Sequence, residues 1–474
     1  MKVLPINPTE NASSEALLEF LGQCRQVAAT KDHDQLVSIS ITVDALDPLA
    51  VLETIYEPEH PHFYAEHPSE GTAIAGAEVA LELTAGGPDR FAKLQQFADE
   101  AFDNAIGVGS VSAPFGGPHI FVAAAFAEES EPDEPFPALT AFVPHWQVAR
   151  AGDSTTAVAN FLVGATSDVA AVAGRVLRAH QRFSAFGVDS RKESSVAEIP
   201  TSFTQSESQD YRQAVTAGLS KIQAGEFNKI VLARAVDLKS DTPLPPLEAL
   251  NGLRERFPEC FSFSIANGQG HSFIGASPER LVRVSQGVLE ADVLAGTIQR
   301  GRGAAADAAR GAELQASLKD QHEHRLVLES IVRRLTELGL APEFPDTPRL
   351  RKLANLQHLH TPVRAALTEK VNLLDILTVL HPTPAVGGSP RESAVKSIRS
   401  IEGFPRGLYA GALGWMNARG GGEFMVGIRS ALLNGASARV FAGAGIVEGS
   451  DPDKELAETD LKFRALLEGL RSGV

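Results

Sequence analysis

The stretch AGAGIVEGSDPDKELAETDLK, residues 442–462, carries the most information about the fold. A β-rich run over 438–442 leads through a glycine-rich turn into an amphipathic segment, which predicts a helix from about 452 to 470. Asp451 is a good N-cap, and Pro452 suits the first helical position because its missing N–H is not needed there. The order of strand, glycine turn and capped helix is the first structural prediction.

One face of this predicted helix gathers charged side chains. Glu455, Glu458 and Lys462 are spaced i, i+3 and i+7, so they lie on the same side. From spacing alone, the simplest interpretation is a solvated face with one Glu458–Lys462 ion pair worth about 0.3–0.5 kcal/mol. A second interpretation is that the carboxylates hold a cation, and the spacing leaves both open.

Working outward from this segment, helix and strand signals alternate back to about residue 209. Helices are predicted over 211–224 and 320–338 from apolar residues at helical spacing. Predicted strands are 229–238, then 261–265, 272–274 and 281–284 as successive antiparallel strands, a hairpin of 408–415 with 423–431, and 438–442. Mixed runs of strands and helices favour an α+β fold over a regular βαβ sheet. Neither GxGxxG nor GxxxxGK[ST] is present, so no nucleotide-binding motif is found.

The first half of the chain is weakly patterned. Segments 73–83 and 158–163 fit either strands or buried helices, and the acidic, proline-rich segment 128–137 predicts a solvated loop. The polar segment 190–207, with Pro200 inside it, predicts a linker. No repeat with a period of 20–50 residues is present, which excludes solenoids and propellers.

Composition excludes several classes of protein. The 474 residues include 43 Lys and Arg against 59 Asp and Glu, a net charge of −16, which argues against a nucleic-acid binder or a polybasic membrane contact. No stretch approaches the roughly 18 apolar residues of a membrane helix, and no secretory signal opens the sequence. Cys24 and Cys260 are too few for a disulfide framework or a zinc site. We therefore expect a soluble cytoplasmic protein.

A few residues are candidates for chemistry, each with a plainer alternative. Glu323 lies between His322 and His324, whose spacing is poor for zinc on a helix, but its carboxylate fits a hard cation such as Mg²⁺ together with Glu455 or Glu458. Lys229 opens a strand, where lysine is usually exposed. Glu279 follows Gly275-Ala276-Ser277-Pro278 and reads first as a hydrophilic turn residue. Arg429 is expected to end the strand 424–429, on the face of Met425 and Gly427.

Nine segments in one order form a more specific signal than any of these residues. Together they resemble the chorismate-utilising enzymes, over residues 211–470. The segments are KIVLARA (229–235), FIGASPERL (273–281), LAGT (294–297), KDQHEHRLV (319–327), LQHLHTPV (356–363), HPTPAVGGSP (381–390), GLYAGALGW (407–415), VGIRSA (426–431) and AGAGIVEGSDPDKELAETDLK (442–462).

The resemblance implies a fold. It is a single large α+β domain with two antiparallel sheets flanked by helices. The apparent linker near residue 195 is then no true domain boundary. Residues 1–205 would form the N-terminal part of the sheet scaffold, and residues 206–474 the catalytic region of the same globular unit.

The resemblance also implies roles for single residues. Lys229 matches the general base that activates water, and Glu279 matches the general acid. The positions that match substrate contacts are Gly296, His358, Ala385, Tyr409, Arg429, Lys462 and Gly443, the last in the expected AGAG turn. Glu323 and Glu458 match the Mg²⁺ ligands, with Glu455 nearby and acting through water.

The activity implied is that of an isochorismate synthase, which adds water at C2 of chorismate and removes the C4 hydroxyl. The loop 381–385 resembles these members, and Lys229 separates them from the anthranilate synthases. Alternatives are a salicylate synthase, to which Thr297 in LAGT also points, and an aminating synthase, which would need a glutamine amidotransferase. A binding protein on a decayed scaffold is the alternative outside enzymes. We expect chorismate as the partner, no amidotransferase, and a monomer.

Overall fold

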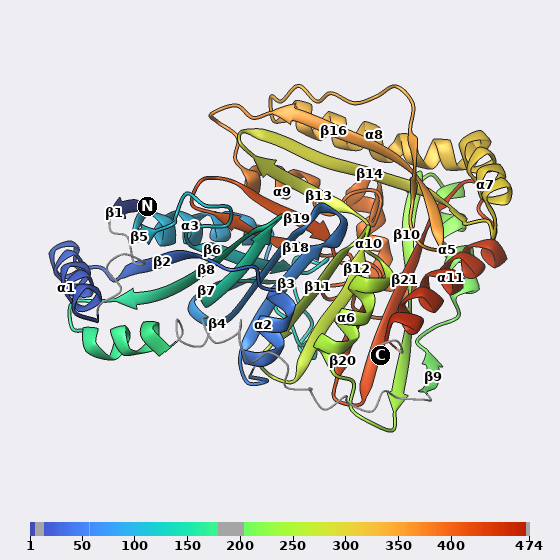
Figure 1. Cartoon of the computed structure of the whole chain (residues 1–474). Coiled ribbons are helices and arrows are strands. Elements are labelled where there is room, and N and C mark those ends of the chain that lie inside the picture. The colour runs from blue at the N-terminus through green and yellow to red at the C-terminus, as the bar shows by residue number, and fades with distance from the viewer. Residues whose placement is uncertain (5–13, 56, 179–202, 471–474) are drawn as a thin grey trace.

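The computed structural model describes residues 1–4, 14–55, 57–178 and 203–470. The strands of these ranges form one hydrogen-bonded network, mostly antiparallel, with helices on its outer faces (Figure 1). The predicted α+β class is confirmed. No helix within the described ranges is long and apolar enough to cross a membrane.

The network folds into two layers. The first layer begins at β10 (Lys229–Ser240), which pairs along one edge with β9 (Phe203–Glu207) and β17 (Gly388–Ser389). From the other edge of β10 the layer continues, in spatial order, through β21 (Ser437–Val447), β20 (Ser430–Asn434), β12 (His271–Ser277), β11 (Phe261–Asn267), β3 (Pro61–His67), β4 (Thr72–Ala85), β7 (Leu139–Ala151), β8 (Ser154–Val163), β2 (Gln35–Val43), β5 (Ala105–Gly109) and β1 (Lys2–Leu4). The second leaves β7 and runs through β6 (His119–Ala124), β18 (Ala412–Asn417), β19 (Gly422–Val426), β13 (Arg280–Ser285), β14 (Val288–Gln299), β16 (Leu356–Ala366) and β15 (Arg349–Lys352).

The two expected sheets are therefore two layers of one network, joined by the long strands β4 and β7. The ladder between these strands shifts register between Val79 and Leu81, next to Glu78 with φ +58°. The layers pack on each other through apolar side chains. The ring of Phe63 on β3 stacks on that of Phe121 on β6, with 4.7 Å between centroids. Both rings are fully buried.

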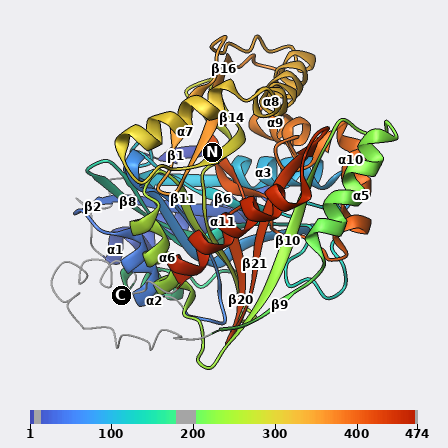
Figure 2. The same ribbon diagram turned by 90° about the vertical axis from the view of Figure 1, so that its right-hand side faces the viewer.

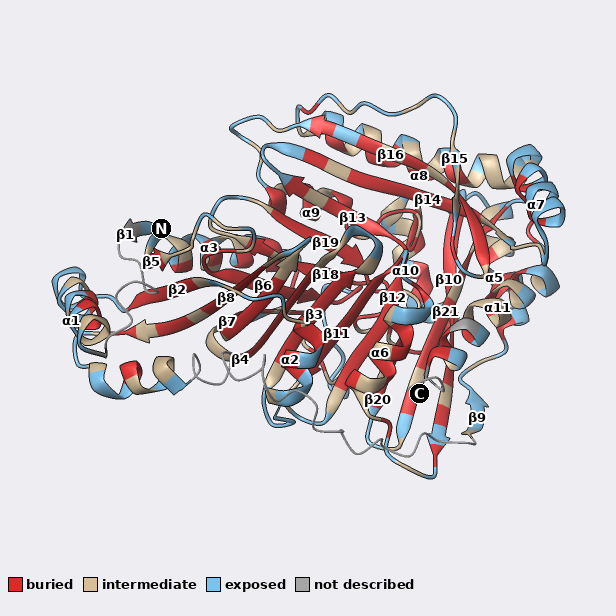
Figure 3. Ribbon diagram, viewed as in Figure 1, coloured by how far each residue is buried: buried red, intermediate tan, exposed pale blue. Residues whose placement is uncertain are grey.

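Helices cover the outer faces of the layers. They are α1 (Ser14–Lys31), α2 (Pro48–Ile55), α3 (Arg90–Asp103), α5 (Tyr211–Gln223), α6 (Pro246–Arg256), α7 (Ala304–Ala316), α8 (Leu318–Glu337), α9 (Leu373–Leu380), α10 (Arg391–Glu402) and α11 (Pro452–Leu470), with a 3-10 turn η1 (Pro68–Glu70). Figure 2 shows α11 crossing β21 and β10 next to α5, and α8 packs on β14 in the second layer. Most strand residues are buried, whereas α1 and α7 expose long faces (Figure 3).

The helix and strand predictions of the C-terminal half are largely confirmed. The helix predicted over 452–470 is α11, and the Asp451 carboxylate caps it by accepting the N–H groups of Asp453 and Lys454. The ambiguous segments 73–83 and 158–163 are strands, in β4 and β8. The predicted linker is wrong at its end, because Phe203–Glu207 forms β9 on the edge of β10; its residues 190–202 lie outside the described residues.

Three local predictions need correction. β12 and β13 are not neighbours: β12 pairs with β20 and β13 with β19, because the corner at Pro278 carries the chain from one layer to the other. Strand β19 ends at Val426, so Arg429 lies beyond it with φ +53° rather than at a strand end. Gly443 is not in a turn, since β21 continues to Val447.

Candidate active site

A pocket opens between the two layers, where β10 and β21 face β14 and β16. The pocket and its mouth enclose about 660 Å³. Helix α8 contributes Glu323 to its wall and α11 contributes Glu458 and Lys462. The expected site residues on its wall are Glu279, Gly296, Glu323, His358, Ala385, Tyr409, Arg429, Gly443, Glu458 and Lys462. Of the expected set, Lys229 and Glu455 lie outside this wall: Lys229 contacts Glu323 of the wall, and Glu455 contacts Lys319, which does not line the pocket.

Lys229 lies directly behind Glu323. It opens β10 between Val447 of β21 and Ser389 of β17, and its side chain is 0% exposed. Pairing on both sides explains why this strand-start lysine is buried rather than solvated. The Lys229 Nζ lies 3.0 Å from Oε1 of Glu323. Burial works to raise the pKa of Glu323, but Lys229, with the further charges of Lys319 and Lys462, outweighs it and holds this pKa below the usual range.

Glu279 sits at the corner between β12 and β13 and is only 4% exposed. Its backbone is held in place because Val426 donates its N–H to the Glu279 carbonyl at 3.1 Å. Burial raises the pKa of Glu279 to about 8, with a further push from the Asp292 carboxylate, against the opposing charges of Lys229 and Arg351. The turn interpretation of Glu279 is wrong, and a buried carboxylic acid faces the pocket.

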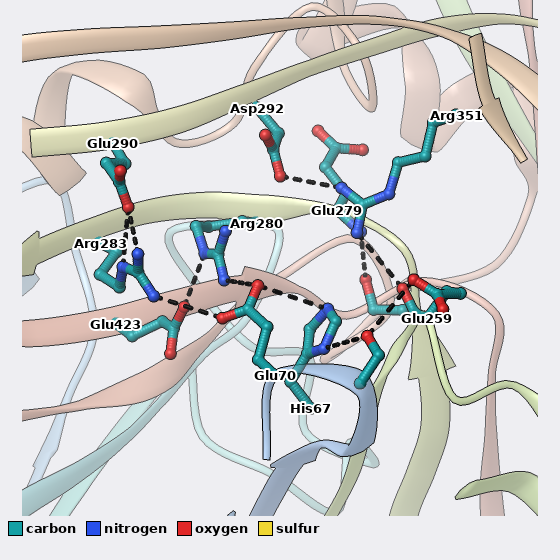
Figure 4. A network of polar contacts seen from close by, with 12 residues as sticks. His67, Glu70, Glu259, Glu279, Arg280, Arg283, Glu290, Asp292, Arg351 and Glu423 are labelled. Carbon is teal, nitrogen blue, oxygen red and sulfur yellow. Dashed lines mark hydrogen bonds and ion pairs between the residues drawn. The ribbon is translucent and has the colours of Figure 1, made fainter. Parts of the chain in front are cut away.

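A polar network surrounds this corner (Figure 4). Arg351 donates to Asp292 at 3.1 Å and to the Glu259 carbonyl at 3.3 Å. Outside the figure's labelled residues, His360 contacts Asp292 at 2.7 Å. Arg280, the residue after Glu279, donates hydrogen bonds to both Glu70 and Glu423, each at 2.6 Å. These contacts fix the strands on either side of Glu279. Asp292 and Arg351 were missed from sequence because they meet only through the pairing of β14, β15 and β16.

The opposite side of the pocket is cationic. Arg429 is half-buried, and its Nη2 lies 3.5 Å from Nε2 of His358, whose Nδ1 lies 3.1 Å from the Thr297 hydroxyl. Burial, with the charges of Arg429 and Lys462, holds the pKa of His358 well below its usual value, so the ring is neutral. Lys462 donates to the Gly443 carbonyl at 2.6 Å and to Glu458 at 2.7 Å. Two fixed cations therefore face a space that suits an anionic ligand.

Glycines on β21 make room for these groups. A Cβ at position 443 would lie 2.7 Å from the Tyr409 hydroxyl, and one at position 445 would lie 2.0 Å from Oε1 of Glu323. Strand alternation places both glycines on one face. Gly445 was missed from sequence, although the AGAG alternation carries that signal. Gly296 has φ +78°, which only glycine adopts without strain.

The expected metal ligands are each paired with a lysine. Glu323 contacts Lys229, Glu458 contacts Lys462, and Glu455 accepts from Lys319 at 2.6 Å. Within the described ranges, no three carboxylate or imidazole groups lie close enough to hold one ion as they stand. Burial opposes the charge of Lys319, yet all three glutamates together raise its pKa. Oxygen donors of this kind, gathered around one lysine, fit Mg²⁺ by their chemistry.

Comparison with known proteins identifies the class of protein that this fold and pocket define. The chain belongs to the chorismate binding enzyme family, whose model matches residues 19–471. The resemblance seen in the nine sequence segments is thereby confirmed.

Individual relatives and solved structures show which members of this family the chain resembles. The salicylate biosynthesis isochorismate synthase of Pseudomonas aeruginosa is 34% identical over 473 residues, 99% of this chain and 96% of that protein. Isochorismate synthase MenF of Bacillus subtilis is 32% identical over 98% of this chain and 99% of that protein. MenF, the menaquinone-specific isochorismate synthase from Escherichia coli, aligns with a TM-score of 0.76 at 26% identity, over 97% of this chain and 99% of that chain. Anthranilate synthase component I from Streptococcus pneumoniae TIGR4 shares the fold, with a TM-score of 0.68 at 19% identity over 84% and 92% of the two chains.

Proposed function

We propose that this protein is a Mg²⁺-dependent isochorismate synthase, which converts chorismate to isochorismate. One observation carries the proposal: a buried carboxylic acid, Glu279, lines one pocket with Arg429 and Lys462, and a buried amine, Lys229, lies 3.0 Å behind Glu323 of the same wall. The full-length similarity to isochorismate synthases supports the same activity.

The charges of the pocket suit the substrate. Chorismate carries two carboxylates, which a protein of net charge −16 repels at long range. Arg429 and Lys462 supply local positive charge in a partly desolvated space, where Coulomb attraction is stronger than in water. Tyr409 stacks on Phe441, with 5.0 Å between ring centroids, and aliphatic side chains such as Val231, Ala385 and Val386 form another part of the wall. These groups bind and orient a small dicarboxylate ring.

Lys229 then acts as the base and Glu279 as the acid in the reaction. Lys229 first gives the proton of its ammonium group to solvent, and the amine then accepts a proton from water while the water oxygen bonds to C2. Both ring double bonds shift, from C1–C2 and C5–C6 to C1–C6 and C4–C5, and the C4–oxygen bond breaks. The leaving oxygen takes the proton of Glu279 and departs as water. The balance is one water added and one released, and solvent returns a proton to Glu279 and takes one from Lys229.

The proposed Mg²⁺ site is formed by glutamate carboxylates at the pocket. Glu323 and Glu458 would hold Mg²⁺, with Glu455 acting through water. A bound divalent cation screens the protein carboxylates from a substrate carboxylate and so turns repulsion into attraction. Glu458→Gln tests this assignment. It should raise the Mg²⁺ concentration needed for half-maximal rate, and an unchanged titration would remove Glu458 from the site.

A salicylate-forming lyase is the second candidate, because Thr297 lines the pocket and contacts His358. Incubating the purified protein with chorismate and Mg²⁺, with and without ammonium, separates the candidates by product. Isochorismate alone is expected. Salicylate with pyruvate would support the lyase, an ammonium-dependent product would support an aminating enzyme, and binding without turnover would support a non-catalytic role.

The proposal extends to organisation. Residues 1–205 serve as scaffold and residues 206–474 as catalytic region of one globular unit, supported by the pairings of β3 with β11 and of β6 with β18. We place the enzyme in the cytoplasm as a monomer that works without an amidotransferase. Light scattering of the purified protein and the ammonium arm of the assay test the last two points.

A further inference from the structure

A fully buried ion pair lies behind the pocket and outside the residues assigned so far. Glu402 ends α10, and Arg406 follows four residues later in the connection to β18. Arg406 Nε donates to Glu402 Oε2 at 2.9 Å, and the two side chains are 3% and 0% exposed. Burying two charges is costly unless their other hydrogen bonds are also satisfied, so the remaining partners of this pair are informative.

The first partners are backbone groups of β10. On one side β10 pairs with β17 only at Lys229 and Ile230, and with β9 only from Val236 onward. Within the described part of the chain, no strand pairs with residues 231–235 on that side. There, Arg406 donates to the Val231 carbonyl at 2.8 Å, and Glu402 accepts the N–H of Ala233 at 2.6 Å. The Glu402–Arg406 pair therefore satisfies two backbone groups that a neighbouring strand would otherwise bind, while the Val231 N–H donates to the Gly387 carbonyl and the Ala233 carbonyl accepts from Gln209.

The remaining contacts reach other walls of the pocket. Arg406 also donates to the carbonyl of Val386 at 2.8 Å, in the loop that carries Ala385. Its guanidinium lies 5.7 Å from the ring centroid of Tyr409. Val231, Ala385, Val386 and Tyr409 all line the pocket. One guanidinium thus joins three wall segments that are far apart in the chain.

We infer that the Glu402–Arg406 pair consists of positioning residues, which fix the spacing of the strand that begins at Lys229, the loop of residues 381–388, and Tyr409 around the substrate. This inference rests on the proposed function. Neither side chain lines the pocket, so both act through the walls that they join. A lysine at position 406 keeps the charge but lacks the planar fork that reaches two carbonyls and a carboxylate together.

Arg406→Lys tests the inference. We expect kcat for isochorismate formation to fall about 100-fold with a much smaller change in KM, since misplacement of reacting groups by about 1 Å can cost that much. Backbone amide exchange supplies a readout that is independent of activity. The amide of Ala233, which donates to Glu402, should exchange faster in the variant. The amide of Val231 should follow, because it donates to the Gly387 carbonyl in the loop that Arg406 holds at Val386.

Arg254→Lys is the matched control. Arg254 also binds two carboxylates, Asp47 and Glu66, in a largely buried site that does not line the pocket. It should lower thermal stability with kcat and KM unchanged. If Arg406→Lys behaves like this control, the pair is merely structural and the inference is overturned.

Glu402→Gln covers the case in which Arg406→Lys does not fold. Its amide oxygen still accepts from Ala233, whereas its hold on Arg406 weakens, so the same loss in kcat is expected at smaller size. If this variant also fails to fold while Arg254→Lys folds, the pair is a folding element and the inference is overturned. If the wild-type protein forms no isochorismate, the proposed function fails, whereas the exchange result still reports whether the pair holds the walls.

Discussion

The two halves of the chain share one sheet network but contribute differently to the pocket. Residues on its wall run from Val231 to Lys462, and none of the described residues before position 179 is among them. The first half nevertheless supplies strands in both layers, such as β3 and β6. The first half therefore supports the sheet network without lining the pocket, and the second half supplies every described residue of the pocket wall. We call this the division between support and chemistry. The predictions below test how sharp that division is.

Lys229→Ala should have the largest effect. Removing the proposed base should lower kcat about 10³-fold, within the range known for general bases. Chorismate binding in the presence of Mg²⁺, measured by calorimetry, should remain. Lys239→Ala, an exposed lysine on the same strand, is the control and should leave kcat unchanged. Near-normal turnover in Lys229→Ala would show that the base lies elsewhere.

Gly445→Ala should have the next largest effect. The added Cβ would lie 2.0 Å from Oε1 of Glu323, so this carboxylate must move away from Lys229. Because the clash is with the end of a flexible side chain, the fold should persist while kcat falls about 100-fold. Gly22→Ala in α1, where a Cβ meets nothing within 4 Å, is the matched control. Equal activity in both variants would mean that the position of Glu323 is unimportant.

Asp292→Asn should shift a pH profile rather than abolish activity. Glu279 must be protonated to donate, so with a pKa of about 8 the rate should decline as pH rises through about 8. Removing the Asp292 charge lowers that pKa, since carboxylate repulsion disappears and the charge of Arg351 is no longer balanced by Asp292. The alkaline limb of kcat against pH should move to lower pH. Asp237→Asn, in a surface pair with Arg439, should not move it.

The parts predicted from sequence are those that local physics decides. Helix α11 was predicted because its cap at Asp451 and its apolar spacing lie within the segment itself. The burial of Lys229 and Glu279 was not predicted, because it arises from strands and a corner supplied by distant segments. The left-handed Arg429 gave no local signal either, since its conformation is imposed between two strands.

The N-terminal half illustrates the same limit. Strand β9 is polar and mostly exposed, so its composition resembles a linker, and only pairing with β10 makes it a strand. For the site, the resemblance identified most wall residues, because the motifs of residues 229–462 are constrained by chemistry. The supporting contacts of Asp292 and Arg406 are set by tertiary packing and left no motif.

Two buried phenylalanines, one in the scaffold half and one beside the pocket, test the division between support and chemistry with the smallest expected effect on turnover. Phe121 stacks on Phe63 in the scaffold half, whereas Phe441 stacks under Tyr409 at the pocket. Truncation of a buried phenylalanine to alanine costs about 3–5 kcal/mol, and Phe121→Leu should cost less because leucine fills part of the space. The free energy of unfolding, measured with denaturant, tests this. Its kcat and KM per folded molecule should stay at wild-type values.

Phe441→Leu should instead lower kcat/KM a few-fold, in keeping with the about 0.5–1.5 kcal/mol of an aromatic pair. Its loss of stability should match that of Phe121→Leu, because both side chains are buried in apolar surroundings. A turnover defect in Phe121→Leu equal to that in Phe441→Leu would show that strain in the scaffold reaches the pocket through β6 and β18. The two halves would then be coupled in catalysis, and the division between support and chemistry would not hold.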